Sequence, residues 1–220
     1  MGRTISLAEG LSAYVAEPAE PAAASVVVIQ EIFGVNTHIR SVADGYAAEG
    51  YLAIAPALFD RVEPGVEFDY SAASVAKGVA LAGRVGFDQA LSDVGRAIDW
   101  AEAQTPGHVG VVGFCLGGSL AWLAAARLRP RAAVAYYGGQ IPQFRDEAPL
   151  APILLHFGEK DGYIPLEAAR DVERLYPDIP VHFYPAEHGF NCDARASYHR
   201  DSALLARSRT LDFLREHLLS

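Results

Sequence analysis

The segment of residues 109–118, VGVVGFCLGG, constrains the fold of this chain most strongly. An apolar run leads into the pattern Gly-x-Cys-x-Gly, with Gly113, Cys115 and Gly117 at the fixed positions, and the following residues 119–126 favour a helix. A side chain at the tip of such a tight strand-to-helix turn needs neighbours that have almost no side chain. The segment therefore predicts a nucleophile elbow with a cysteine at its tip.

This placement would put Cys115 at the N-terminus of a helix. The helix dipole and the unsatisfied backbone N–H groups at that end favour a thiolate, and the N–H of Leu116 would point toward a developing oxyanion. The alternative is a buried cysteine that only packs inside a glycine-rich turn, since free cysteine is among the most buried residue types.

The composition limits the kinds of protein that this chain can be. The 220 residues are 51% hydrophobic and 20% charged, which is enough for the core of one α/β domain. The N-terminal residues lack the apolar stretch of a signal peptide, and no long uncharged apolar run occurs, so we expect a soluble cytoplasmic protein that does not bind membranes. A net charge of -9 without a Lys/Arg cluster argues against nucleic-acid binding. We expect a monomer.

The two cysteines, Cys115 and Cys192, are too few for a disulfide framework. Neither has metal-type spacing with the seven histidines, so we expect reduced thiols and no metal site. Cys192 is interpreted as a small buried hydrophobic residue.

Apolar, β-branched runs alternate with helical stretches, which predicts an α/β fold with a mostly parallel sheet covered by helices on both faces. The expected strands cover residues 25–30, 51–56, 108–114, 132–137, 153–157 and 181–184. The expected helices cover residues 39–49, 87–103, 118–128, 166–176 and 196–218. We predict a single domain, residues 1–220, that begins with an edge hairpin over about residues 4–21, turning at Glu9 and Gly10. Residues 60–86 look irregular and are equally compatible with a lid and with a plain surface excursion.

A cysteine nucleophile needs a base, and the base needs an orienting acid. Asp161 follows the predicted strand at residues 153–157, and His188 follows the strand at residues 181–184. The chain order Cys115, Asp161, His188 is the order expected of an α/β-hydrolase sheet. Each residue also lies at the carboxyl end of a strand, where open α/β sheets bind their ligands.

Each of these two residues also has a simpler interpretation. Asp161 before Gly162 is an ordinary turn sequence, and His188 before Gly189 could be a loop residue bonded to a carbonyl. Glu159 is the second choice for the acid. The competing histidines are less well placed, because they fall inside a strand (His156) or in and beside helices (His38, His199 and His217).

A carboxylate, Glu31, ends the first apolar strand just before a loop that contains Gly34. In α/β-hydrolases this position supplies the second oxyanion-hole N–H, which we assign to Ile32. A carboxylate near a thiol could hold its proton if burial raises the carboxyl pKa. The alternative for Glu31 is a strand-end acid paired with a surface arginine.

Four ordered motifs, QEIFG at residues 30–34, GFCLGG at 113–118, GEKD at 158–161 and EHGF at 187–190, resemble the dienelactone hydrolases, also called carboxymethylenebutenolidases. The resemblance extends from Ser25 to the C-terminal helix. It implies an α/β-hydrolase fold, no cofactor, and hydrolysis of a lactone or activated ester through an acyl-thioester.

The resemblance also implies residue roles. Cys115 would be the nucleophile, His188 the base, Asp161 its orienting acid and Glu31 the carboxylate that keeps the resting thiol neutral, and the N–H groups of Ile32 and Leu116 would form the oxyanion hole. Family members that act on dienelactone bind the substrate carboxylate with arginines, one of them four residues after the catalytic histidine.

In this chain the position four residues after His188 is Cys192. Arg195 and Arg84 are candidate replacements, and each could equally be a solvated surface arginine.

The sequence thus predicts a small-molecule lactone or ester hydrolase. One alternative keeps the same triad but transfers the acyl group to another acceptor. The other is a catalytically silent α/β-hydrolase fold that only binds a ligand.

Overall fold

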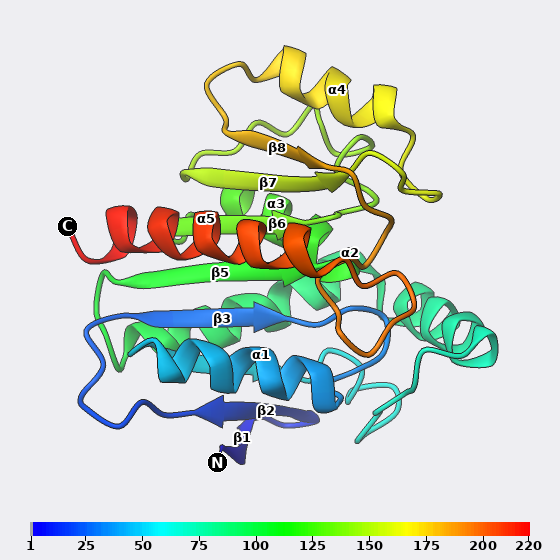
Figure 1. Ribbon diagram of the computed structural model, residues 1–220. Coiled ribbons are helices and arrows are strands. Elements are labelled where there is room, and N and C mark those ends of the chain that lie inside the picture. Colours follow the sequence, from blue (N-terminus) through cyan, green and yellow to red (C-terminus); the bar gives the residue numbers. More distant parts are fainter. Residues whose placement is uncertain (1) are drawn as a thin grey trace. The chain divides into compact units, whose positions relative to one another are not determined.

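The computed structural model describes residues 2–220, in which strands and helices alternate along most of the chain (Figure 1). Two compact units are present, one ending at Val111 (unit 1) and one comprising Val112–Ser220 (unit 2). The elements are β1 Arg3–Ala8, β2 Leu11–Ala16, β3 Ser25–Ile29, α1 Thr37–Ala48, β4 Leu52–Pro56, α2 Ala72–Glu102, β5 Val109–Phe114, α3 Leu116–Arg127, β6 Ala132–Tyr136, β7 Ile153–Gly158, α4 Leu166–Leu175, β8 Val181–Tyr184 and α5 Arg200–Leu218.

Unit 1 places its strands in the order β1-β2-β4-β3. Strands β3 and β4 are parallel, with Val26 opposite Ala53, and every residue of both is buried. Such continuous burial is typical of parallel strands that are covered on both faces. Helix α1 lies on one face of these strands and α2 on the other (Figure 1).

Unit 2 contains the parallel strands β6, β7 and β8, in that order. Helix α3 packs on one face of β6 and α5 on the other (Figure 1). The boundary between the units falls within β5, whose end is bound to β6 where the Cys115 N–H donates to the Tyr136 carbonyl at 3.0 Å. The carboxyl ends of parallel strands share one edge of a sheet, so the loops after β6, β7 and β8 in this unit leave from the same edge.

The predicted strands are present within a few residues of their expected ends, and so are all predicted helices except the one expected to begin at Phe87. Gly50, expected to end a helix, adopts φ 93° immediately after the C-cap of α1. The prediction of an irregular stretch up to Gly86 is wrong, because α2 begins at Ala72 with Ser71 as its N-cap. Gly86 (φ 71°) kinks the helix, and the helix predicted to begin at Phe87 is the part of α2 that follows this kink.

The predicted N-terminal hairpin is present. Strands β1 and β2 pair antiparallel with Thr4 opposite Tyr14, and Gly10 adopts φ 67° in the turn. Whether residues 60–86 move as a lid stays a prediction.

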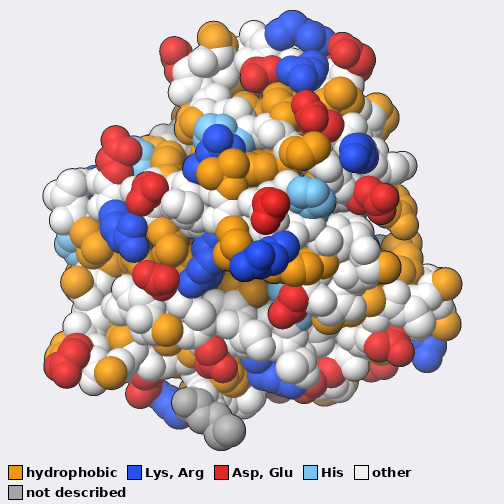
Figure 2. Space-filling model, in the orientation of Figure 1, with side chains coloured by type: hydrophobic (Ala, Val, Ile, Leu, Met, Phe, Trp, Pro, Cys, Tyr) orange, Lys and Arg blue, Asp and Glu red, His pale blue; other side chains and the backbone are white. Residues whose placement is uncertain are grey.

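Charged side chains of both signs are interspersed on the face shown in Figure 2. Among residues 2–220, none of the helices combines the length and the apolar character required to span a bilayer.

Candidate active site

The predicted elbow is present at the junction of β5 and α3. Cys115 is the N-cap of α3 and adopts φ 55° and ψ -111°, a conformation that non-glycine residues rarely adopt. A Cβ atom added to Gly113 would lie 1.8 Å from the Gly117 carbonyl oxygen, and one added to Gly118 would lie 2.4 Å from the Tyr136 carbonyl oxygen. The backbone therefore approaches itself so closely around Cys115 that only glycine fits at both positions.

Replacing Gly113 by alanine should accordingly destabilise unit 2. The new methyl group would meet backbone atoms that cannot rotate away, and overpacking of this kind costs about 1–3 kcal/mol or more. The matched control is Gly139→Ala, because a Cβ atom there meets nothing within 4 Å. Thermal unfolding of both variants measures the difference, and equal melting temperatures would contradict the steric account of the elbow.

The structure brings Asp161 and His188 together. Asp161 Oδ2 lies 2.8 Å from His188 Nδ1, and since an ionised carboxylate only accepts, the ring donates from Nδ1. The other Asp161 oxygen accepts from the backbone N–H groups of Tyr163 at 2.8 Å and Ile164 at 3.0 Å. The Asp161 side chain is fully buried and the His188 side chain is 8% exposed, so the carboxylate is fixed and the imidazole is held by it.

The loops that carry these two residues are bound to each other. Glu159 N–H donates to the Tyr184 carbonyl at 2.7 Å, and Lys160 N–H donates to the Ala186 carbonyl at 3.0 Å. A Cβ atom on Gly158 would lie 2.4 Å from the Ala186 carbonyl oxygen. The end of β7 and the segment after β8 thus touch backbone to backbone, which fixes the spacing of the acid and the imidazole.

The His188 ring also hydrogen-bonds the Cys115 side chain. Burial alone would lower the pKa of His188, but the charge of the Cys115 thiolate, the hydrogen bonds to Asp161 and Cys115, and the charge of Asp161 together raise this pKa to about 10. A raised pKa favours the protonated ring. The arrangement therefore favours an imidazolium beside the Cys115 side chain.

The raised pKa of His188 makes the stability of the folded state depend on pH. Because the pKa of His188 rises on folding from 6.5 to about 10, protonation of the ring stabilises the folded state fully below pH 6.5. That contribution is lost as the pH rises through about 10.

The Leu116 N–H occupies the position expected of an oxyanion donor within unit 2. Leu116 is the first residue of α3, and the first N–H groups of a helix have no acceptor within the helix. This N–H belongs to the residue directly after Cys115, the position that supplies an oxyanion donor in the elbows of α/β-hydrolases.

Two tyrosines that the sequence prediction did not include pack against the His188 ring. The Tyr137 ring centroid lies 5.0 Å from that of His188, and the Tyr163 ring meets it edge-on at 5.1 Å. Tyr137 is fully buried, whereas Tyr163 is 70% exposed. Both follow the ends of parallel strands, so the rule that predicted Asp161 and His188 could have found them.

Glu159 and His156, the competing candidates for the acid and the base, have other partners. Glu159 is exposed and lies 3.9 Å from Arg170. His156 is fully buried, as predicted, and its ring nitrogens lie 2.8 Å from the Tyr184 hydroxyl and 3.0 Å from the Thr210 hydroxyl. Burial, together with the charges of His182 and Arg209, holds the pKa of His156 well below its usual value, so this histidine is a neutral core residue.

The other histidines lie where the sequence predicted, in or beside helices. His38 is in α1, His199 is the N-cap of α5 and His217 is in its last turn.

Three candidate residues lie in unit 1. Glu31 follows β3 and is 1% exposed, with a carboxylate oxygen within 4.8 Å of a ring nitrogen of the buried His38. Ile32 is half-buried in the loop that follows, and Arg84 is exposed on α2. An acid this deeply buried differs from the surface strand-end acid that was the alternative for Glu31.

Arg195 lies beside the candidate base in unit 2. A Cβ atom added to Gly189 would be 2.4 Å from Arg195 Nη1, so the guanidinium covers the residue next to His188. Arg195 is half-buried, and Cys192 is fully buried as predicted. A positively charged side chain thus lies in the segment that follows the candidate base.

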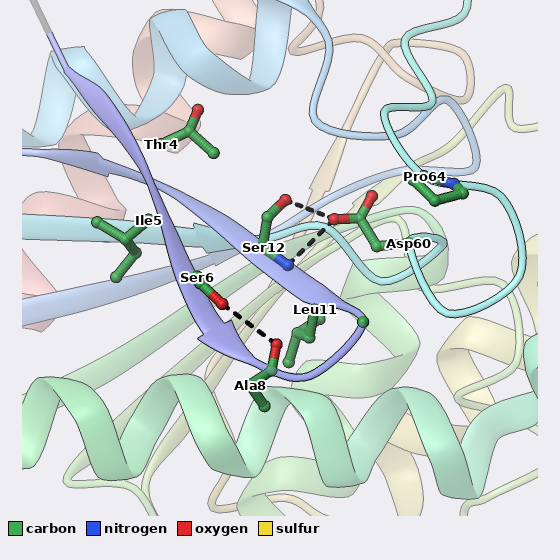
Figure 3. Close-up of a pocket in the computed structure, with 9 residues that line it drawn as sticks. Thr4, Ile5, Ser6, Ala8, Leu11, Ser12, Asp60 and Pro64 are labelled. Carbon is green, nitrogen blue, oxygen red and sulfur yellow. Dashed lines mark hydrogen bonds between the residues drawn. The ribbon is translucent and has the colours of Figure 1, made fainter.

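A separate hollow of about 370 Å³ lies in unit 1, between the hairpin and the loop that contains Asp60 (Figure 3). One Asp60 carboxylate oxygen accepts from the Ser12 backbone N–H at 3.0 Å and from the Ser12 hydroxyl, and the other accepts from Gly65 N–H. None of the residues that line this hollow belongs to the predicted site, and its one acid is already bonded.

Comparison with known proteins identifies related sequences over nearly the whole chain. The family model named Dienelactone hydrolase family matches residues 11–218. Carboxymethylenebutenolidase 1 of Cupriavidus pinatubonensis is 31% identical over 210 residues, which cover 92% of this chain and 90% of that protein. Carboxymethylenebutenolidase of Pseudomonas putida is 34% identical over 211 residues, covering 92% and 89%.

Solved structures agree with this result. A Klebsiella pneumoniae protein assigned as a dienelactone hydrolase superposes with a TM-score of 0.81 at 33% identity, covering 94% of this chain and 93% of that one. The dienelactone hydrolase-like promiscuous phosphotriesterase P91, from metagenomic libraries, gives a TM-score of 0.82 at 20% identity, with 99% and 98% covered, which indicates a shared fold. The predicted α/β-hydrolase fold is confirmed.

Proposed function

This chain belongs to the dienelactone hydrolase family of lactone and ester hydrolases, and from that premise we propose that it hydrolyses its substrate through an acyl-thioester on Cys115. The observation that carries the proposal is the arrangement in unit 2. A strained cysteine at the start of α3 is hydrogen-bonded to His188, which Asp161 orients at 2.8 Å.

The first half of the reaction forms the thioester. The Cys115 thiolate attacks the carbonyl carbon, and the resulting oxyanion is stabilised by the N–H groups of Leu116 and Ile32. The tetrahedral intermediate collapses with cleavage of the C–O bond, and the His188 imidazolium donates its proton to the departing oxygen. In a lactone this oxygen stays attached to the acyl chain, whereas in an ester it leaves as an alcohol.

The second half releases the acid. Neutral His188 takes a proton from water, and the hydroxide so formed attacks the thioester carbonyl. Collapse of this second intermediate expels the Cys115 thiolate and leaves His188 protonated, which restores the starting pair. Asp161 holds the ring in the required tautomer throughout.

Glu31 is proposed to pair with the Cys115 thiol before substrate binds. The resemblance implies a neutral resting thiol. We propose the thiolate–imidazolium pair as the reactive form, which is present once Glu31 no longer pairs with the thiol.

Hydrolysis and acyl transfer are separated by one experiment. The purified protein is given a phenyl ester in water with increasing concentrations of a small alcohol or amine, and both acyl products are measured. Hydrolysis predicts the free acid as the main product at every concentration. Dominance of the transfer product at low acceptor concentration would instead assign an acyltransferase.

Arg195 is proposed to bind a substrate carboxylate. Replacing it by alanine should raise KM for a lactone carboxylate about 10- to 100-fold, the equivalent of one charge-assisted hydrogen bond, and should raise KM much less for a neutral ester of similar size. Arg84→Ala is the matched comparison, since Arg84 is the other candidate. Steady-state kinetics measure KM for both substrates in each variant. An equal increase in KM for both substrates in Arg195→Ala would exclude carboxylate recognition by this residue.

A further inference from the structure

The loop at residues 31–36 of unit 1 is held by the segment at residues 66–78 of the same unit. Phe68 N–H donates to the Phe33 carbonyl at 2.9 Å, and Gly34 forms an antiparallel bridge with Glu67. The Asn36 side-chain amide donates to the Phe68 carbonyl at 3.1 Å. The loop that contains Ile32 is therefore paired along its length rather than open.

Gly78 forms the closest contact of this segment with Ile32. This glycine is buried on α2, and a Cβ atom added to it would lie 2.1 Å from the Ile32 carbonyl oxygen and 3.1 Å from the Ile32 Cβ atom. The atom it would meet first is backbone, which cannot rotate away as the end of a side chain could. The backbone of the helix thus packs directly on the backbone of the loop, and no other residue type fits.

The neighbouring glycines of α2 have different roles. A Cβ atom on Gly83 would meet nothing within 4 Å, and Gly86 has a positive φ of 71° at the kink. Gly78 lies in regular helix between Ser71 and this kink. Since glycine costs about 1 kcal/mol relative to alanine inside a helix, its presence at position 78 is explained by the space it leaves for Ile32.

We infer that Gly78 is a positioning residue, which sets the place of the Ile32 backbone and so of the Ile32 N–H that stabilises the oxyanion. This inference rests on the proposed function, in which Ile32 supplies that donor. Oxyanion donors act only when they lie about 2.7–3.1 Å from the developing charge. A side chain at position 78 would push the loop away from α2 and move the donor out of this range.

The test compares Gly78→Ala with Gly83→Ala, a matched change on the same helix. Two reactions of Cys115 are measured for each variant: acylation by a phenyl ester in rapid mixing, and alkylation by iodoacetamide. Alkylation displaces iodide and forms no oxyanion. Gly78→Ala should slow acylation by about 10- to 100-fold and leave the alkylation rate within about twofold, because loss of a whole oxyanion donor costs about 10²–10³-fold. Gly83→Ala should change neither rate.

Equal acylation rates in the two glycine variants would overturn the inference. So would parallel loss of acylation and alkylation in a folded Gly78→Ala protein, because that pattern indicates general disruption of the site. If circular dichroism shows that Gly78→Ala is unfolded, Tyr70→Ala replaces it, since Tyr70 precedes α2 and this change removes its ring contact with Phe33 at 4.6 Å in the same loop. Tyr70→Ala should then slow acylation alone, and unchanged acylation there would overturn the inference.

A failure of the proposed function gives a different result. In that case the wild-type protein forms no acyl group on Cys115 at all, whatever residue stands at position 78.

Discussion

Replacing Cys115 by alanine should abolish hydrolysis of an activated ester, lowering kcat by at least about 10⁴-fold, because no other group stands at the tip of the elbow to form the covalent intermediate. Cys115→Ser should also fall far short of the wild-type rate, since a hydroxyl is a much weaker acid than a thiol and the site is suited to sulfur. The measurement is turnover of p-nitrophenyl acetate by proteins whose folding is verified by circular dichroism.

The second cysteine provides the control for this change. Cys192 is fully buried and lies outside the proposed triad, so Cys192→Ala should retain turnover. Ester turnover at the wild-type rate in Cys115→Ala would remove Cys115 from its assigned role. So would a loss of turnover that occurs in Cys192→Ala and not in Cys115→Ala.

Replacing His188 by alanine should lower kcat/KM by about 10³- to 10⁴-fold, because the thiol then loses both its base and the proton donor for the leaving group. His217→Ala serves as the matched control, since His217 lies in the last turn of α5 outside the proposed triad. Steady-state kinetics on an activated ester compare the two variants. Similar rates in both would show that the imidazole at position 188 does not act in catalysis.

The same variant tests the protonation of the His188 ring. Because the pKa of His188 is raised to about 10, the ring holds a proton at neutral pH. The NMR signals of a protonated imidazole should therefore be present at neutral pH in the wild-type protein and absent in His188→Ala. A neutral His188 ring at this pH in the wild-type protein would contradict the raised pKa.

The elbow and the two strand-end residues could be predicted from sequence because short-range steric rules determine them. Gly113 and Gly117 flank Cys115 at a spacing that only a strand-to-helix turn explains, and the apolar runs before Asp161 and His188 place both at the carboxyl ends of strands. The choice of Asp161 over Glu159 was made from sequence because Glu159 comes earlier in the loop. In the structure Asp161 contacts His188, whereas Glu159 is exposed beside Arg170.

The first half of α2 could not be predicted in the same way. Gly78 and Gly83 weaken its local helix signal, and Gly78 is there because of a contact with Ile32, 46 positions earlier in the chain. A single sequence holds no trace of such a tertiary requirement. The two tyrosines around His188 lie where the strand-end rule points. They were missed for a different reason, because a tyrosine after a strand is far more often an ordinary core or surface residue than part of a site.

The central claim, a covalent acyl group on the Cys115 sulfur, is tested most directly by intact mass spectrometry of the acid-quenched protein after mixing with excess of a slowly hydrolysed ester. The account predicts a mass increase of one acyl group that maps to the peptide containing Cys115 and does not form in Cys115→Ala. An adduct on a different residue, or ester turnover by Cys115→Ala at the wild-type rate, would contradict it.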